Sequence, residues 1–267
     1  MAVWPLLLII WGILLLSGKS GGSLGCLISL LILLVMAGAL YTFSFTFIRS
    51  PMGPVVETRF ELAKEDQVEV LELDLVHHSG EFFPAADNAS HNLLNAVFAS
   101  YASPDIRQNV FGSTARVSVS DVDFPGNWRN RFSRWDLRLS PDTPAQISLR
   151  TGATRAVLDM RRLHVAMLEL KMGAGDLTIY LGSYDGVVNI ESGAGNVVVY
   201  VPDNTGIRMK VSGGLVNVSG ENAGIVGHGD RSYSSRQLEN KEAIIDIHFT
   251  AGAGSVTIRP APAGSML

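Results

Sequence analysis

A glycine-centred unit of about twenty residues recurs along the second half of the sequence. In its clearest copy, residues 168–181, apolar residues alternate with other residues on both sides of Gly173-Ala174-Gly175. Alternation with a period of two is typical of half-buried strands, so each copy predicts two strands joined at a glycine corner. Glycine suits such a corner because it tolerates positive φ and close backbone approach.

The same layout recurs upstream and downstream of this copy, with a degenerate first copy near residue 80. The second corner residues, at positions 154, 175, 195, 214 and 254, are 21, 20, 19 and 40 residues apart. We interpret the polar, glycine-rich residues 220–241 within the last interval as a degenerate coil or a long loop. The predicted corner glycines are Gly80, Gly152, Gly173, Gly175, Gly193, Gly195, Gly213, Gly214, Gly252 and Gly254.

A coil of this length cannot close its own core, so repeated coils stack and bury their inward residues against one another. Five or six inward side chains give a gross driving force of ~10 kcal/mol per coil, before chain entropy is subtracted. The sequence therefore predicts a mostly β, solenoid-like domain over residues 59–259. The alternative is an ordinary β-sandwich with glycine turns, which rarely keeps so constant a spacing.

The segment before the regular repeats, residues 85–135, has less clear periodicity. One stretch predicts a helical face capped by Ser90, and residues 116–124 predict a strand. We expect a linker at residues 49–58 and a disordered tail at residues 260–267. The residues of the predicted helical face are Leu93, Leu94, Val97, Phe98 and Tyr101.

The first 48 residues contain a single charged side chain, Lys19. Two apolar runs, residues 2–16 and 26–48, flank a polar turn, and the longer run could extend ~35 Å as a helix, against ~30 Å of hydrocarbon core. We therefore predict a two-helix transmembrane hairpin at residues 1–48, with the lipid bilayer as a partner. The predicted location is the plasma membrane, with a multi-pass topology.

Two other interpretations of this N-terminal segment are less consistent with the sequence. A cleaved signal peptide would have a basic region before the apolar run, and a lipoprotein signal would have leucine where Ser23 precedes Cys26. Basic residues near the membrane number three on the C-terminal side and one in the turn, so the positive-inside rule favours a cytoplasmic β domain. The three are Arg49, Arg59 and Lys64.

Composition argues against several classes of function. The net charge of −4 without a basic cluster disfavours nucleic-acid binding. The single cysteine, Cys26, allows neither an internal disulfide nor a thiolate metal site. The six histidines lack ligand spacing; His77 and His78 leave a strand on opposite faces, and His77 occupies the register position of Met172. We expect no metal site.

Enzymatic chemistry is also not indicated. Most corners are too short to build a cleft over the sheet, and Asp176, after Gly175, fits a turn-capping role. The Gly-Ala-Gly sequence lacks the third glycine and the following helix of a dinucleotide fingerprint. We therefore expect no catalytic residues, no cofactor and no enzymatic activity.

Two groups of motifs resemble a known bacterial family. Residues 3–16 resemble the short transmembrane motif shared by LiaI and LiaF-like proteins. Residues 171–176 and 191–196, with Trp135-Asp136-Leu137-Arg138-Leu139 ahead of them, resemble the toastrack domain of LiaF-like proteins. The resemblance implies a right-handed β-solenoid and a role in the cell-envelope stress response. It also implies a two-component kinase or a phage-shock-type protein as partner, and no catalytic residues to carry over.

Three functions are compatible with these observations. The first is a membrane-anchored sensor or regulator of the bacterial cell-envelope stress response that acts through protein–protein interaction. The second is a passive structural β-solenoid scaffold whose coils stack between molecules. The third is an extracytoplasmic carbohydrate-binding β-helix.

Overall fold

The computed structural model describes residues 55–262 except residues 90, 123–131 and 221–222, and these residues belong to one compact unit. They form thirteen strands of one sheet and a short 3-10 helix. The elements are β1 (Val56–Ala63), β2 (Val70–Ala86), β3 (Asn92–Ser100), β4 (Asp105–Phe111), β5 (Thr114–Ser120), β6 (Phe132–Leu139), β7 (Ala145–Asp159), β8 (Val165–Tyr180), β9 (Gly186–Val201), β10 (Thr205–Gly220), β11 (Ile225–Gly227), β12 (Ser232–Ser235), η2 (Leu238–Asn240) and β13 (Ala243–Pro260).

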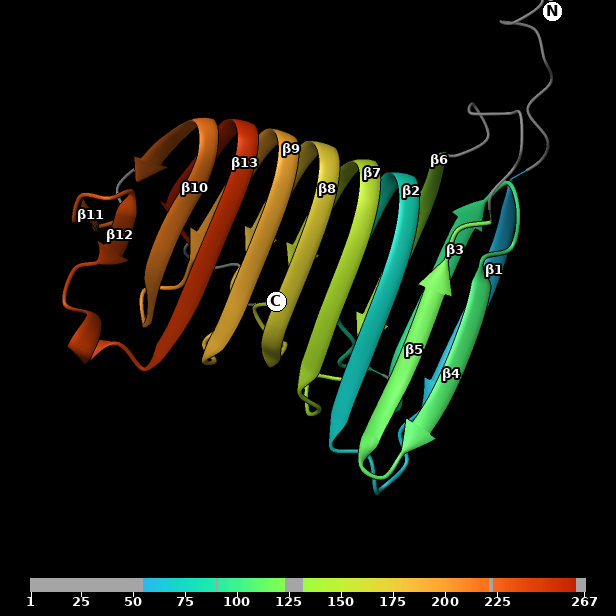
Figure 1. The fold of residues 1–267 in the computed structure, drawn as a ribbon. Helices are drawn as coiled ribbons and strands as arrows, with labels where there is room; N and C mark the ends of the chain where they lie inside the picture. Colours follow the sequence, from blue (N-terminus) through green and yellow to red (C-terminus); the bar gives the residue numbers. More distant parts are fainter. Residues whose placement is uncertain (1–54, 90, 123–131, 221–222, 263–267) are drawn as a thin grey trace, which may run out of the picture. The chain divides into compact units, whose positions relative to one another are not determined.

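Six long strands carry the architecture: β2, β7, β8, β9, β10 and β13. Each bends sharply near its middle, so that its two halves belong to two layers (Figure 1). In β8, Leu168 and Leu170 before the bend and Leu177 and Ile179 after it are buried between the layers. The prediction of a mostly β, solenoid-like stack is confirmed, and each predicted pair of strands is one continuous bent strand.

The long strands pair in parallel, but their order departs from the chain order. In the sheet, β2, β7, β8 and β9 are neighbours in that order, followed by β13 and then β10. Strand β13, the last in the chain, therefore lies between β9 and β10. Gly254 therefore pairs with Gly195, whereas Gly214 lies beside Gly252. The predicted alignment of position 214 with position 254 is wrong by two residues, because Val216 is the residue of β10 that pairs with Gly254.

At the N-terminal end of the stack the two layers separate. The first half of β2 pairs in parallel with β5, and its second half pairs in parallel with β6. Strand β4 then adds antiparallel to β5, while β3 and β1 continue antiparallel beyond β6.

The helix predicted around residues 93–101 is wrong. Leu94, Ala96 and Phe98 are buried in alternation, as in a strand, and β3 pairs with β6 on one side and β1 on the other. These two backbone ladders and the buried face outweigh the helix-like spacing of Leu93 and Val97, since tertiary pairing overrides a local pattern.

The residues between the corners at 214 and 254 do not build a complete coil. Strand β12 pairs antiparallel with three residues of the first half of β10, and β11 pairs with β12. Ala223, Ile225 and Tyr233 pack against the last core residues. This segment therefore covers the first half of β10 at the C-terminal end of the stack.

The prediction of a transmembrane hairpin, and with it a multi-pass location in the membrane, is corrected. Among the residues that the structure describes, no helix has the length and the apolar character needed to cross a bilayer. Both predicted spans, residues 2–16 and 26–48, lie outside the described residues, as do most of the predicted linker and part of the predicted tail.

Candidate binding groove at the glycine corner

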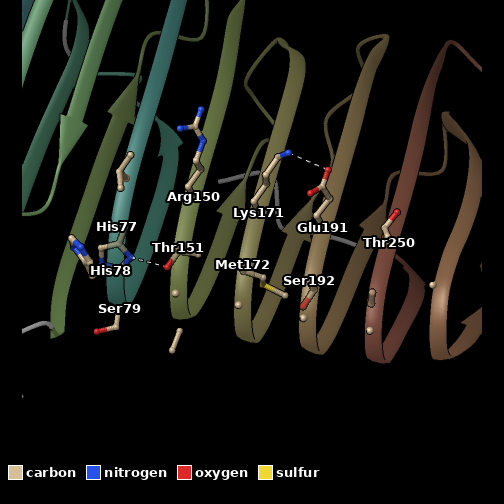
Figure 2. A pocket seen from close by; sticks show the side chains of 18 of the residues that line it. His77, His78, Ser79, Arg150, Thr151, Lys171, Met172, Glu191, Ser192 and Thr250 are labelled. Atoms are coloured by element: carbon tan, nitrogen blue, oxygen red, sulfur yellow. Dashed lines mark hydrogen bonds and ion pairs between the residues drawn. The ribbon is translucent and has the colours of Figure 1, made fainter. Parts of the chain in front are cut away.

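An open groove with a volume of about 970 Å³ runs across the long strands beside their bends (Figure 2). Its floor is a column of glycines, one from each of five neighbouring coils. Its wall is formed by the outward side chains two residues before the floor glycine in four of these strands, β7, β8, β9 and β13. The floor glycines are Gly152, Gly173, Gly193, Gly252 and Gly214.

The floor lacks side chains because the backbones of neighbouring coils touch there. A Cβ atom at Gly173 would lie 2.6 Å from the carbonyl oxygen of Gly152, and one at Gly193 would lie 2.4 Å from that of Gly173. Both distances are below van der Waals contact, so only glycine fits. The groove is thus a consequence of how tightly the coils stack.

A second column of corner residues lies two positions further along each strand. Gly80, Thr154, Gly175, Gly195 and Gly254 pair in register from β2 to β13. The one side chain in this column, that of Thr154, donates a hydrogen bond from Oγ1 to the carbonyl oxygen of Gly80 (3.1 Å). Of the other predicted corner glycines, Gly213 lines the groove beside Gly214.

The groove wall carries charge. Arg150 of β7 and Lys171 of β8 are cross-strand neighbours, followed by Glu191 of β9 and Thr250 of β13. The Lys171 ammonium group lies 3.2 Å from the Glu191 carboxylate. The wall therefore offers Arg150, the Lys171–Glu191 ion pair and the hydroxyl of Thr250 beside a bare backbone floor, which suits an extended polar segment.

A polar cluster closes the β2 end of the groove. The backbone N–H of His78 donates to Asp121 Oδ2 (2.9 Å), and its ring Nδ1 lies 3.7 Å from the same oxygen. Ser133 Oγ lies 3.3 Å from Asp121 Oδ2. Asp121 therefore links His78, at the end of the groove, to Ser133 of β6.

His77 points inward from this cluster and is 1% exposed. Its Nδ1 lies 3.5 Å from Thr151 Oγ1, and its ring centroid lies 4.9 Å from that of Trp135. Burial lowers the pKa of His77 by disfavouring the charged ring, against the opposing attraction of Asp121. The register position predicted for His77, level with Met172, is confirmed.

Sequence reasoning missed several residues of this region. Asp121 meets His78 across 43 positions of sequence, and no local pattern indicates that contact. Arg150 and Thr250 could have been found, because they occupy the register position of Lys171 in their own copies. Within the described residues, no three histidine, cysteine or acidic side chains are grouped so as to hold a metal ion.

A comparison with known protein families assigns this chain to a family. Residues 52–200, more than half of the sequence, match the family model described as the N-terminal domain of toast_rack, DUF2154. The chain belongs to the toast_rack family. No curated protein matches the sequence.

A comparison with solved structures matches this chain to proteins from three bacteria. A candidate cell adhesion protein from Clostridium sporogenes is 21% identical, with a TM-score of 0.70, and the match covers 77% of this chain and 99% of that one. Candidate adhesins from Bacteroides fragilis and Parabacteroides merdae are each 10% identical, with TM-scores of 0.27 and 0.25. Those matches cover 79% and 78% of this chain and 98% and 82% of the other chains. The first match shows a shared fold.

Outside the groove, polar side chains of the toast_rack domain pair with each other across coils. The rings of Tyr180 and Tyr200 stack 4.7 Å apart at 7°, and the Arg161 guanidinium lies 5.2 Å from the Tyr180 centroid. On the other layer, Arg208 Nε lies 2.7 Å from Asp246 Oδ1. These ladders hold neighbouring coils in register.

The burial of His77 predicts a stability that depends on pH. The unfolded chain takes up a proton near pH 6.5, whereas the folded domain takes it up only at lower pH. Unfolding is therefore favoured as pH falls below about 6.5, with a slope of up to about 1.4 kcal/mol per pH unit from this group. Denaturant titrations at several pH values should show this slope, and His77→Gln should reduce it.

The exposed His248 provides the matched control for this titration. His248→Gln should retain the dependence on pH, because it leaves the buried His77 and its neighbours unchanged. Equal slopes for His77→Gln and the unaltered protein would contradict the assignment. The charged or titratable groups that face His77 are Asp121 and His78, and both remain in each variant.

Proposed function

We propose that this toast_rack chain is a structural scaffold that holds a protein partner without chemically transforming it. The groove carries the proposal. A floor of bare backbone beside Arg150 and Lys171 gives an extended segment of a partner room to lie across five coils. Such a surface recognises shape and charge.

The rest of the domain supports a scaffolding role. Charged and aromatic side chains are used in pairs that tie coil to coil, as at Tyr180–Tyr200 and Arg208–Asp246. The fold is shared with the candidate cell adhesion protein from Clostridium sporogenes, so adhesion between molecules or cells is a role that this proposal includes.

A second candidate function is regulation of the cell-envelope stress response. The toast_rack match over residues 52–200, together with the resemblance of residues 135–139 and 171–176 to LiaF-like proteins, favours it. In that case the partner in the groove is a two-component kinase or a phage-shock-type protein. Both candidates involve the same surface and differ in the partner.

Photo-crosslinking in the producing cells tests the scaffold. A benzophenone amino acid at Thr250, on the groove wall, should yield a discrete protein adduct. The same substitution at Thr178, on the outer face of the second layer, should not. Lys171→Gln should weaken the adduct by up to about fivefold, because one charge contact contributes up to about 1 kcal/mol.

The identity of the adduct separates the two candidates. A kinase or a phage-shock-type protein would support regulation, whereas a structural envelope or surface protein would support scaffolding. Equal adducts from positions 250 and 178, or none from position 250, would contradict the role of the groove. A partner that carries a covalent change made by this chain would contradict the proposal that the partner is held without being transformed.

A further inference from the structure

The second half of β10 is an exposed edge of the sheet. The first half of this strand pairs with β13 on one side and with β12 on the other. Among the described residues, Leu215–Gly220 pair with β13 alone. Leu215 is 84% exposed, the highest value among the large apolar side chains that the structure describes. This edge has backbone groups available to a further strand.

The other described edges carry the features that block such pairing. Strand β1 presents Glu57, Arg59 and Glu61, and β4 presents Asp105 and Arg107, while β11 has three residues. Charges and short length are common means by which proteins prevent edge pairing. The second half of β10 has neither a charge nor a proline. It is a neutral edge in a sheet whose other long edges are charged.

We propose that a second copy of this chain pairs with this edge, β10 against β10, in an antiparallel two-fold dimer. The charge pattern selects this partner. A head-to-tail assembly would place the neutral edge against the charged β1 or β4, whereas self-pairing joins two neutral edges. A strand that pairs antiparallel with itself also gives the closed, isologous symmetry that most homodimers have.

The sequence of the edge fits one register. Directly opposite residues of an antiparallel pair share a face. With Asn217 opposite Asn217 of the second copy, Val216 faces Val218 of the second copy on the core side. Both valines are half-buried and pack at the end of the core. Leu215 then lies opposite Ser219 of the second copy on the outer face. This register continues both the sheet and its apolar layer across the two-fold axis.

The dimer goes beyond the proposed scaffold function and involves a different surface. The groove wall at Lys171 and Thr250 lies on the outer face before the bend, whereas the β10 edge lies after it. Failure of the dimer would leave the crosslink from position 250 unchanged, so the two proposals fail separately.

A symmetric disulfide tests the register in the full chain, with Cys26 replaced by serine. Opposite residues of an antiparallel pair have Cα atoms about 4.5–5.5 Å apart, within the range that a disulfide spans. Asn217→Cys should therefore form a covalent dimer under mild oxidation at least tenfold faster than Glu61→Cys. Glu61 is an exposed residue of the charged β1 edge and serves as the matched control.

Sedimentation of the full chain gives an independent measurement. Asn217→Lys places two like charges at the two-fold axis and should weaken dimerisation at least tenfold. Asn109→Lys, a matched change on the exposed β4 edge, should leave it unchanged. If other parts of the full chain also associate, that association contributes equally to the sedimentation of both variants. A response shared by the two variants, or a monomer at every concentration, would overturn the proposal, as would equal crosslinking from positions 217 and 61.

Discussion

Replacing Gly175 with alanine is expected to lower the free energy of unfolding by about 3 kcal/mol or more. The added Cβ would lie 1.9 Å from the carbonyl oxygen of Thr154, and backbone atoms cannot move aside as a flexible side chain can. The φ of +144° at this residue adds strain of about 1–3 kcal/mol for any residue with a Cβ. Urea denaturation followed by far-ultraviolet circular dichroism would measure the loss.

Gly112, in the turn between β4 and β5, is the matched control for this experiment. Its φ is +59°, but no heavy atom lies within 4 Å of the position of an added Cβ. Gly112→Ala should therefore cost about 1–2 kcal/mol, from the left-handed conformation alone. A loss at Gly175 no larger than that at Gly112 would show that the coils are less tightly stacked at the corner than the structure indicates.

The bent strands are the part of the fold that could be predicted from the sequence. Alternating apolar residues around Gly173-Ala174-Gly175 indicate a half-buried strand on each side, because a period of two has few other causes. The same local pattern gives the inward position of His77. The bent strand of each repeat can therefore be predicted from the local sequence, without knowledge of any contact between coils.

The order of the coils was not predictable by the same argument. Each coil presents a similar apolar stripe to either neighbour, so the pattern permits β13 either beyond β10 at the end of the stack or between β9 and β10. The contacts that join Asp121 to His78 and β3 to β6 depend on residues about forty positions apart, which a periodicity does not link. For the candidate site, the sequence places Lys171 on the outward face of its strand. It does not show which strands lie on either side, so the groove wall that Lys171 forms with its neighbours could not be predicted.

Replacing Trp135 with alanine is expected to destabilise the domain by about 3–5 kcal/mol, because it empties a fully buried site. Trp135 is 0% exposed and is among the largest fully buried side chains. Its ring meets Phe98 edge to face, with centroids 5.1 Å apart, and meets His77 on another side. The cavity would open where the two layers separate, between β6 and the bend of β2. Phe111→Ala, at a side chain that is 67% exposed, should change stability by about 0.5 kcal/mol or less.

Trp135→Phe separates the packing of the ring from its polar atom. Trp135 Nε1 is buried without a hydrogen-bond partner among the described residues, and so is His77 Nε2. Phenylalanine keeps an aromatic ring against Phe98 and removes the unpaired N–H, so relief of that unpaired group should offset part of the lost volume. The expected loss is well below that of Trp135→Ala. Equal losses for the two variants would contradict this separation, because the phenyl ring would then contribute nothing to stability.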